Sequence, residues 1–186
     1  MIKESAVYHF IDQKKQYALT IFNGSKFMLD LATWQNFSSK EITALRPLIL
    51  SLQSMITVVK NNESFGAYVS NEDNSIKFNI EAHANGHSRL LLKNSIEIPE
   101  KLNGICRFIK FQPNESNPYT SIIELKNSSM REVTKKIIEN SYQFDAHIEI
   151  IEENDLCFLM TKFPDYQDDF KKVLPSAEVN KKIVEQ

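Results

Sequence analysis

A change in hydrophobic period divides the first 36 residues into two parts. Residues 6–11 and 17–22 are rich in β-branched and aromatic side chains and flank a polar segment, which predicts an opening hairpin. Beyond Asn23 the apolar positions recur every three to four residues, which predicts a short helix to about residue 36. Phe27, Leu31 and Trp34 form a stripe beside Met28 on one face of this helix.

The most apolar segment of the chain is 40–60. Its apolar residues recur at spacings of three and four and predict a central buried helix: Ile42, Leu45, Ile49, Leu52, Ile56 and Val59. Ser38 or Ser39 offers an N-cap, and Glu41 is placed to complete a capping box with Ser38. Pro47 lacks a backbone N–H, so we expect either a kink there or a helix that begins near Arg46.

Strand signals dominate the rest of the chain. The predicted strands are 65–69, 76–82, 89–92, 105–111, 119–125, 147–151 and 156–163. Asn85-Gly86 predicts a two-residue type I′ hairpin turn. An amphipathic helix is predicted over 130–142, with Ser128 or Ser129 as its cap. Runs of strands and hairpins interrupted by about three helices predict an α+β fold with mostly antiparallel sheets.

The length of 186 residues predicts one globular domain, which we place at residues 1–164. After Pro164 the sequence becomes more charged. Residues 165–186 are therefore predicted to form a linker or docking tail, with a short apolar stripe of Phe170, Val173 and Leu174.

Charge and cysteine content narrow the classes of function. With 22 basic and 24 acidic residues the formal net charge is −2, so we expect no nucleic-acid partner. No apolar run approaches the roughly 20 residues of a membrane span, and we expect a cytoplasmic protein without a membrane partner. Cys106 and Cys157 are far apart in apolar runs, which is typical of buried thiols rather than of a zinc pair.

The candidates for catalysis and metal binding are weak. A two-residue turn at Asn85-Gly86 directs His83 and His87 to opposite faces, which argues against a metal site. A hydrolase would need a serine with Asp145 and His147, yet the sequence has no G-x-S-x-G motif. We therefore expect a protein that is not an enzyme and that holds no cofactor within this chain.

Two local motifs carry a family resemblance. Residues 118–125, Pro-Tyr-Thr-Ser-Ile-Ile-Glu-Leu, are similar to a Tyr-x-Gly-x-Val-x-Leu strand, and residues 141–146, Ser-Tyr-Gln-Phe-Asp-Ala, are similar to a Ser-x-Gln-x-x-Thr junction. In this order, after a long apolar helix and a strand, they resemble the substrate-binding domain of the redox-regulated chaperone family called heat-shock protein 33. The chain departs from that family at residues 70–74 and at Arg89-Leu90, where the family has glycine-bearing turns.

The resemblance implies an ATP-independent holdase of the stress response. Such a chaperone binds unfolded or partly folded proteins through a contiguous apolar surface, which in the family is covered by a linker and a zinc-bearing lid until oxidation. The zinc-binding C-x-C and C-x-x-C cysteines do not occur up to Gln186, so zinc is expected only if a cysteine module follows that residue. We therefore predict activity that does not depend on an oxidant.

The surface that binds clients is not fixed by the sequence. The candidates are outward-facing sheet residues and the stripe of the tail: Phe78, Phe108, Ile122, Phe170, Val173 and Leu174. The alternative function is an interaction or assembly module whose apolar face is occupied by a dedicated partner or by a second copy in a homodimer. A small hydrolase is a third hypothesis, and it would require a polar cleft around His147.

Overall fold

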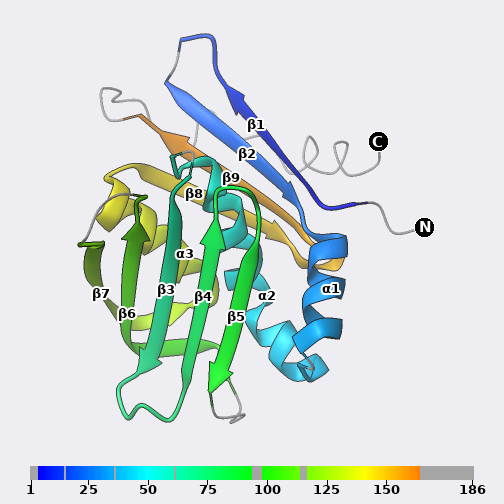
Figure 1. The fold of residues 1–186 in the computed structure, drawn as a ribbon, viewed down its shortest axis with the longest axis vertical. Coiled ribbons are helices and arrows are strands. Elements are labelled where there is room, and N and C mark those ends of the chain that lie inside the picture. The colour runs from blue at the N-terminus through cyan, green and yellow to red at the C-terminus, as the bar shows by residue number, and fades with distance from the viewer. Residues whose placement is uncertain are drawn as a thin grey trace.

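Two antiparallel sheets lie on either side of helices α2 and α3, and helix α1 lies to one side (Figure 1). The computed structural model describes residues 4–14, 16–35, 37–60, 62–93, 98–113 and 117–163. One sheet has four strands in the order β1-β2-β9-β8, and the other has five in the order β5-β4-β3-β6-β7. Helices α2 and α3 contact strands of both sheets, so the two inner faces share one core. The predicted α+β class with antiparallel sheets and about three helices is confirmed.

The four-stranded sheet joins the two ends of the described chain. Its strands are β1 (Ala6–Ile11), β2 (Tyr17–Asn23), β8 (Asp145–Ile151) and β9 (Leu156–Lys162). The predicted opening hairpin is confirmed, and β9 pairs with β2 along the whole of β2. Strands β1 and β8 are therefore the two edges of this sheet.

The five-stranded sheet is built from two hairpins beside a central strand. Its strands are β3 (Ser64–Asn71), β4 (Lys77–His83), β5 (Ser88–Lys93), β6 (Lys101–Phe111) and β7 (Tyr119–Ser129). The sequence predicted β6 only from residue 105, because Gly104 is typical of a loop. In the structure Gly104 lies inside β6 with φ 157°, next to a register shift against β7.

The turn between β4 and β5 differs from the predicted type I′ turn. The N–H of His83 donates to the carbonyl of His87 (2.9 Å), and the N–H of Gly86 donates to the carbonyl of His83 (2.9 Å). Gly86 has φ 89°, whereas Asn85 is not among the described residues with positive φ. The loop therefore has three residues and ends with glycine in the left-handed region. His83 lies opposite His87 across the hairpin. The prediction that the two histidines point to opposite faces is therefore wrong, because it assumed a loop of two residues.

Helix α1 (Ser25–Gln35) follows the predicted boundaries. Met28 and Leu31 of its apolar stripe are buried, but Trp34 is 83% exposed. The core therefore covers only part of the predicted stripe, because periodicity identifies a helix face but not how far along the helix a neighbouring element covers it.

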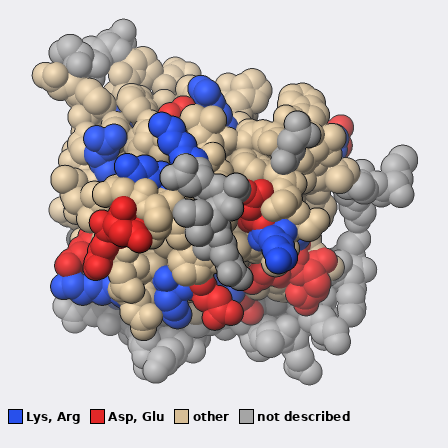
Figure 2. All heavy atoms as spheres, turned by 90° about the horizontal axis from the view of Figure 1, so that it is seen from below, with Lys and Arg blue, Asp and Glu red and all other residues tan. Residues whose placement is uncertain are grey.

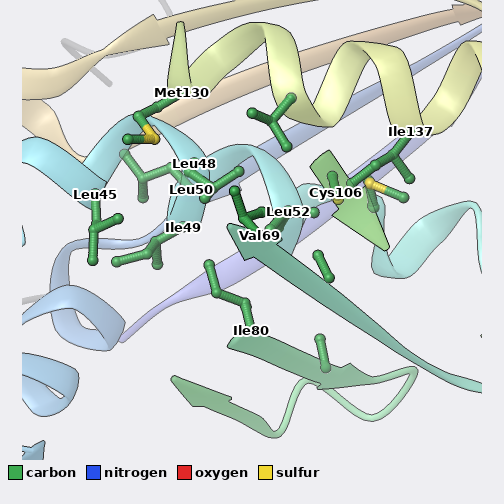
Figure 3. Packing of buried hydrophobic residues seen from close by; sticks show 14 of the residues in the cluster. Leu45, Leu48, Ile49, Leu50, Leu52, Val69, Ile80, Cys106, Met130 and Ile137 are labelled. Atoms are coloured by element: carbon green, nitrogen blue, oxygen red, sulfur yellow. The ribbon is translucent and has the colours of Figure 1, made fainter. Parts of the chain in front are cut away.

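Helix α2 (Ser39–Ser54) is the buried helix that the sequence predicted, and it continues into one 3₁₀ turn, η1 (Met55–Thr57). The capping box of Ser38 and Glu41 is present. The helix passes through Pro47, so the alternative start near Arg46 is wrong. Side chains on several sides of α2 are fully buried, among them Leu48, Leu50 and Leu52. Figure 3 shows them packed between α3 and the strands that carry Val69 and Ile80.

Helix α3 (Met130–Ile137) continues into a π-helical turn, η2 (Ile138–Tyr142), which ends at Gln143 in the left-handed region. The predicted helix over 130–142 is confirmed, and its cap is Ser129. The Ser129 hydroxyl accepts the N–H of Glu132 (3.4 Å), and the Glu132 carboxylate accepts the N–H of Ser129 (2.7 Å). The latter hydrogen bond is the largest cause of a pKa of Glu132 below its ordinary value.

Removal of this cap has a predictable cost. We expect Ser129→Ala to lower the free energy of unfolding by about 1 kcal/mol, because the first turn of α3 loses its side-chain acceptor. Urea unfolding followed by circular dichroism measures this change. Ser129→Asp is the matched control, since it keeps an acceptor at the cap, and equal losses in the two variants would contradict the assignment.

Candidate functional site

The outer face of the four-stranded sheet is apolar over β1, β2 and β9, whereas β8 adds Glu149 and His147 to the same rows. The register aligns Tyr8 with Ile21 and Phe158, and it aligns Phe10 with Leu19 and Met160. Directly paired residues of a sheet point to the same face, and these rows alternate with the rows that enter the main core. We call this surface the outer apolar face; its residues are Tyr8, Phe10, Leu19, Ile21, Ile151, Leu156, Phe158 and Met160. Ile21, Leu156 and Phe158 form a second hydrophobic cluster, with Leu19 and Ile151 packed against it.

The β1 side of the outer apolar face is the part most open to solvent. Tyr8 is 55% exposed and Phe10 is 53% exposed. A groove of about 580 Å³ adjoins them at the β1–β2 turn. Its lining comes from both strands, the turn and β9: Phe10, Ile11, Asp12, Gln13, Lys14, Gln16, Tyr17, Leu19 and Met160. This end of the sheet therefore offers an apolar hollow with a polar rim.

The turn that forms the rim is fixed by Asp12. Its carboxylate accepts backbone N–H groups of Lys14 (3.1 Å), Gln16 and Tyr17 (2.9 Å). The hydrogen bond from Tyr17 is the largest cause of a pKa of Asp12 below its ordinary value. The N–H of Phe163 donates to the carbonyl of Gln16 (2.9 Å), so the chain leaves β9 beside the groove.

The outer face of the five-stranded sheet is more polar. At its centre the Tyr68 hydroxyl donates to the Glu81 carboxylate (2.9 Å), and the guanidinium carbon of Arg107 lies 5.3 Å from the centroid of the Tyr68 ring. Burial, followed by the hydrogen bond to Glu81, raises the pKa of Tyr68. Ile105 and Ile122 flank this cluster. Leu91, Ile109 and Phe111 lie on the same face, but the charged and polar cluster at its centre separates Leu91 from the apolar residues of β6 and β7.

Two of the six residues that were predicted from the sequence to bind clients lie in the core instead of on the surface. Phe78 and Phe108 are both 0% exposed, and the Phe108 ring lies 5.7 Å from that of Phe65 in the core. The expectation that they face outward is wrong, because the register of β3, β4 and β6 turns them towards the helices. Ile122 does face solvent, at 71% exposure. Phe170, Val173 and Leu174 lie outside the described residues.

Sequence reasoning missed the outer apolar face, although a signal was present. Residues 156–160 of β9 are apolar without interruption and are all buried. An unbroken apolar run is typical of a strand that is covered on both faces, whereas a strand with one solvated face alternates. That run could have indicated that the sheet has an apolar surface on the side away from the core.

The residues proposed for hydrolysis are engaged elsewhere. Asp145 forms an ion pair with Lys162 (3.2 Å) at the start of β8. His147 lies opposite Met160, and burial is the main reason that its pKa is lowered. Neither Asp145 nor His147 lines the groove at the β1–β2 turn.

Three further features bear on function: groups of metal-binding side chains, helices that could span a membrane, and the charges on the surface. Within the described ranges, no three or more His, Cys, Asp and Glu side chains come together as a metal site. Over the same ranges, none of the helices combines the length and the apolar character needed to cross a membrane. Lys and Arg side chains are interspersed with Asp and Glu on the face shown in Figure 2.

Both thiols are buried, as the sequence predicted. Burial raises the pKa of Cys106 on β6 and of Cys157 on β9 to about 12. Since the thiolate is the reactive form, we expect neither cysteine to react with a thiol reagent while the protein is folded. Titration with Ellman's reagent in buffer and in 6 M guanidinium chloride tests this. Release of two equivalents only on unfolding is the expected result, and rapid labelling of the native protein would contradict it.

These features define a class of protein: an α+β domain with two helices between two sheets and an apolar sheet face turned away from the core. Residues 5–181 match the family described as Hsp33 protein. The chain therefore belongs to the heat-shock protein 33 family, which is a family of chaperones.

Comparison with solved structures agrees with this assignment. The 33 kDa chaperonin (heat shock protein 33 homolog) of Thermotoga maritima superposes with a TM-score of 0.73 at 11% sequence identity. The superposition covers 94% of this chain and 70% of that chain. At this identity the likeness shows a shared fold. No curated protein matches this sequence significantly.

Proposed function

We propose that this protein is an ATP-independent holdase of the cytoplasm that captures unfolded or partly folded polypeptides on the outer apolar face. The observation that carries the proposal is the pair of aromatic side chains Tyr8 and Phe10, which are about half exposed on β1 and adjoin the apolar side chains that β2 and β9 contribute to that face. Large contiguous apolar surfaces are avoided by soluble monomers unless they bind something. Burial of apolar client side chains against this face releases free energy without any nucleotide.

We further propose that residues 1–164 form the binding domain and that residues 165–186 act as a docking tail. The chain continues from Phe163 beside the groove at the β1–β2 turn, so a segment that follows it is tethered close to the outer apolar face. The apolar stripe of Phe170, Val173 and Leu174 gives the tail a chemistry that matches this face. A tethered segment competes with clients at a high effective concentration, so its affinity for the face need only be low.

Light scattering of a heat-unfolded client enzyme tests the holdase proposal. Without ATP, we expect equimolar protein to suppress aggregation equally in reductant and in peroxide, because both thiols are buried. The double variant Tyr8→Ser/Phe10→Ser is expected to lose most of this suppression. Ile122→Ser, which removes an even more exposed apolar residue from the other sheet, is the control and should leave suppression unchanged.

The outcomes separate the proposal from its alternative, a module for one dedicated partner or for a second copy of the chain. Suppression with several unrelated clients supports the holdase. If the protein suppresses none of them, or if activity is lost in reductant, the proposal is wrong. A homodimer or a complex of fixed stoichiometry in sedimentation, without suppression of aggregation, would instead favour the assembly module.

A further inference from the structure

Strand β1 is an edge of the four-stranded sheet, and within the described residues no strand pairs with its outer side. The N–H of Asp12 donates to the carbonyl of Tyr17 (3.1 Å), which fixes the direction of the backbone groups before it. Because these directions alternate in an antiparallel pair, Tyr8 and Phe10 bond to β2, whereas Val7, His9 and Ile11 point their N–H and C=O groups outward. The outer side of β1 thus presents three consecutive sets of main-chain donors and acceptors.

Among the residues that the structure describes, this edge lacks the protection that the other edges have. Natural sheets block edge pairing with charged residues, prolines, bulges or covering elements. Strand β1 reads Ala-Val-Tyr-His-Phe-Ile and contains no acidic or basic residue other than the histidine, and no proline or glycine. Each of the other three edge strands contains charged residues: Arg89 and Lys93 in β5, Glu124 and Lys126 in β7, and Asp145 and Glu149 in β8. In β7 the Lys136 ammonium also donates to the carbonyl of Glu124 (3.3 Å).

We propose that an extended segment of the unfolded client pairs with β1 as an additional strand of the sheet. Main-chain groups that alternate along a strand are matched by one chemistry, the backbone of another extended polypeptide. The uncharged edge selects segments that also lack charge, proline and glycine, and the side chains on one face of such a segment reach Tyr8, Phe10 and the groove. This inference rests on the proposed holdase function and adds the class of client segment and its mode of binding.

The size of the edge favours a client over a second copy of the chain. Six residues span about 20 Å, so pairing along β1 alone buries far less than the roughly 1,200 Å² that a stable dimer requires. A small interface that combines main-chain hydrogen bonds with a few apolar contacts accepts many client sequences and releases readily. These are the properties that a holdase requires.

The substitution His9→Pro tests the inference in the full-length chain. Proline at this position removes an outward N–H and places its ring on the edge, but it removes no main-chain hydrogen bond to β2. His9→Ala is the matched control, because it loses the same contact between His9 Nδ1 and Thr20 Oγ1 (3.0 Å) but keeps the N–H. Binding of fluorescein-labelled, reduced and carboxymethylated α-lactalbumin is measured by anisotropy. We expect His9→Ala to bind like the wild type and His9→Pro to bind about tenfold more weakly.

Amide hydrogen exchange of the wild-type protein by NMR provides a second measurement that does not depend on the folding of any variant. On addition of the same unfolded protein, we expect new protection at Val7, His9 and Ile11, whereas Tyr8 and Phe10 are protected already. Absence of this protection, or equal affinities of the two His9 variants, overturns the inference and leaves the holdase proposal intact when the wild type binds. Failure of the wild type to bind overturns both. A wild-type dimer that His9→Pro dissociates without weaker client binding assigns the edge to a second copy and overturns the inference.

Discussion

Replacement of Gly104 by alanine is expected to lower the free energy of unfolding by at least about 3 kcal/mol. A Cβ atom at this position would lie 2.1 Å from the carbonyl oxygen of Ser70 and 2.6 Å from the Cα of Asn71. Both atoms belong to the backbone of β3, which pairs with β6 at this point and cannot move aside as a side chain could. The φ of Gly104, 157°, adds to the cost, since residues other than glycine rarely adopt this backbone angle.

Urea unfolding measures the effect, with Gly86→Ala as the matched control. Gly86 also has a positive φ, of 89°, but no atom lies within 4 Å of a Cβ built there. We therefore expect this control to lose only about 1 kcal/mol from backbone strain. If the two variants differ by less than 1 kcal/mol, the close contact between β6 and β3 is not as the structure describes it. If Gly104→Ala does not fold at all while Gly86→Ala folds, the loss of stability exceeds the predicted minimum and the prediction is confirmed.

The second large effect concerns Phe108, which the sequence suggested as a residue that binds clients. The structure places this ring in the core, where its centroid lies 5.7 Å from that of the Phe65 ring and 6.0 Å from that of the Tyr142 ring. We expect Phe108→Ala to lower the free energy of unfolding by about 3–5 kcal/mol, because it leaves a cavity among residues that cannot collapse to fill it. Ile122→Ala, at a site 71% exposed, should change it by less than about 0.5 kcal/mol.

The same pair of variants separates a role in the core from a role at the surface. Unfolding by urea gives the stability of each variant, and aggregation assays below its melting temperature give the activity. Phe108→Ala should retain activity per folded molecule although it is much less stable. A stable Phe108→Ala variant with impaired activity would contradict its assignment to the core.

Most of the secondary structure followed from local sequence. The capping boxes at Ser38 and Ser129 are determined by residues three positions apart, and the long apolar segment allowed only a buried α2. The errors arose where contacts with residues distant in the sequence outweighed a local sequence preference. Gly104 is typical of a loop, yet β3 holds it within a strand. Asn85-Gly86 favours a type I′ turn, yet the register of β4 and β5 requires one more residue in the loop.

The candidate site was less predictable than the fold. Phe78, Phe108 and Ile122 all lie in predicted strands, and alternation alone shows which residues share a face but not which face meets the helices. Only the pairing of β3 with β6 decided that Phe108 is in the core and Ile122 on the surface. The outer apolar face depends on the pairing of β9 with β2, which joins segments more than 130 residues apart.

The sequence by itself determined the α+β class, the family resemblance, the burial of both cysteines and the position of the central helix, because periodicity, capping and apolar runs are local properties of the chain. The tertiary structure alone decided which strands become edges, which glycine lies against a neighbouring backbone and which apolar side chains face solvent. The physical reason is that strand order and register are set by hydrogen bonds and packing between distant segments, and a shift of one residue exchanges the two faces of a strand.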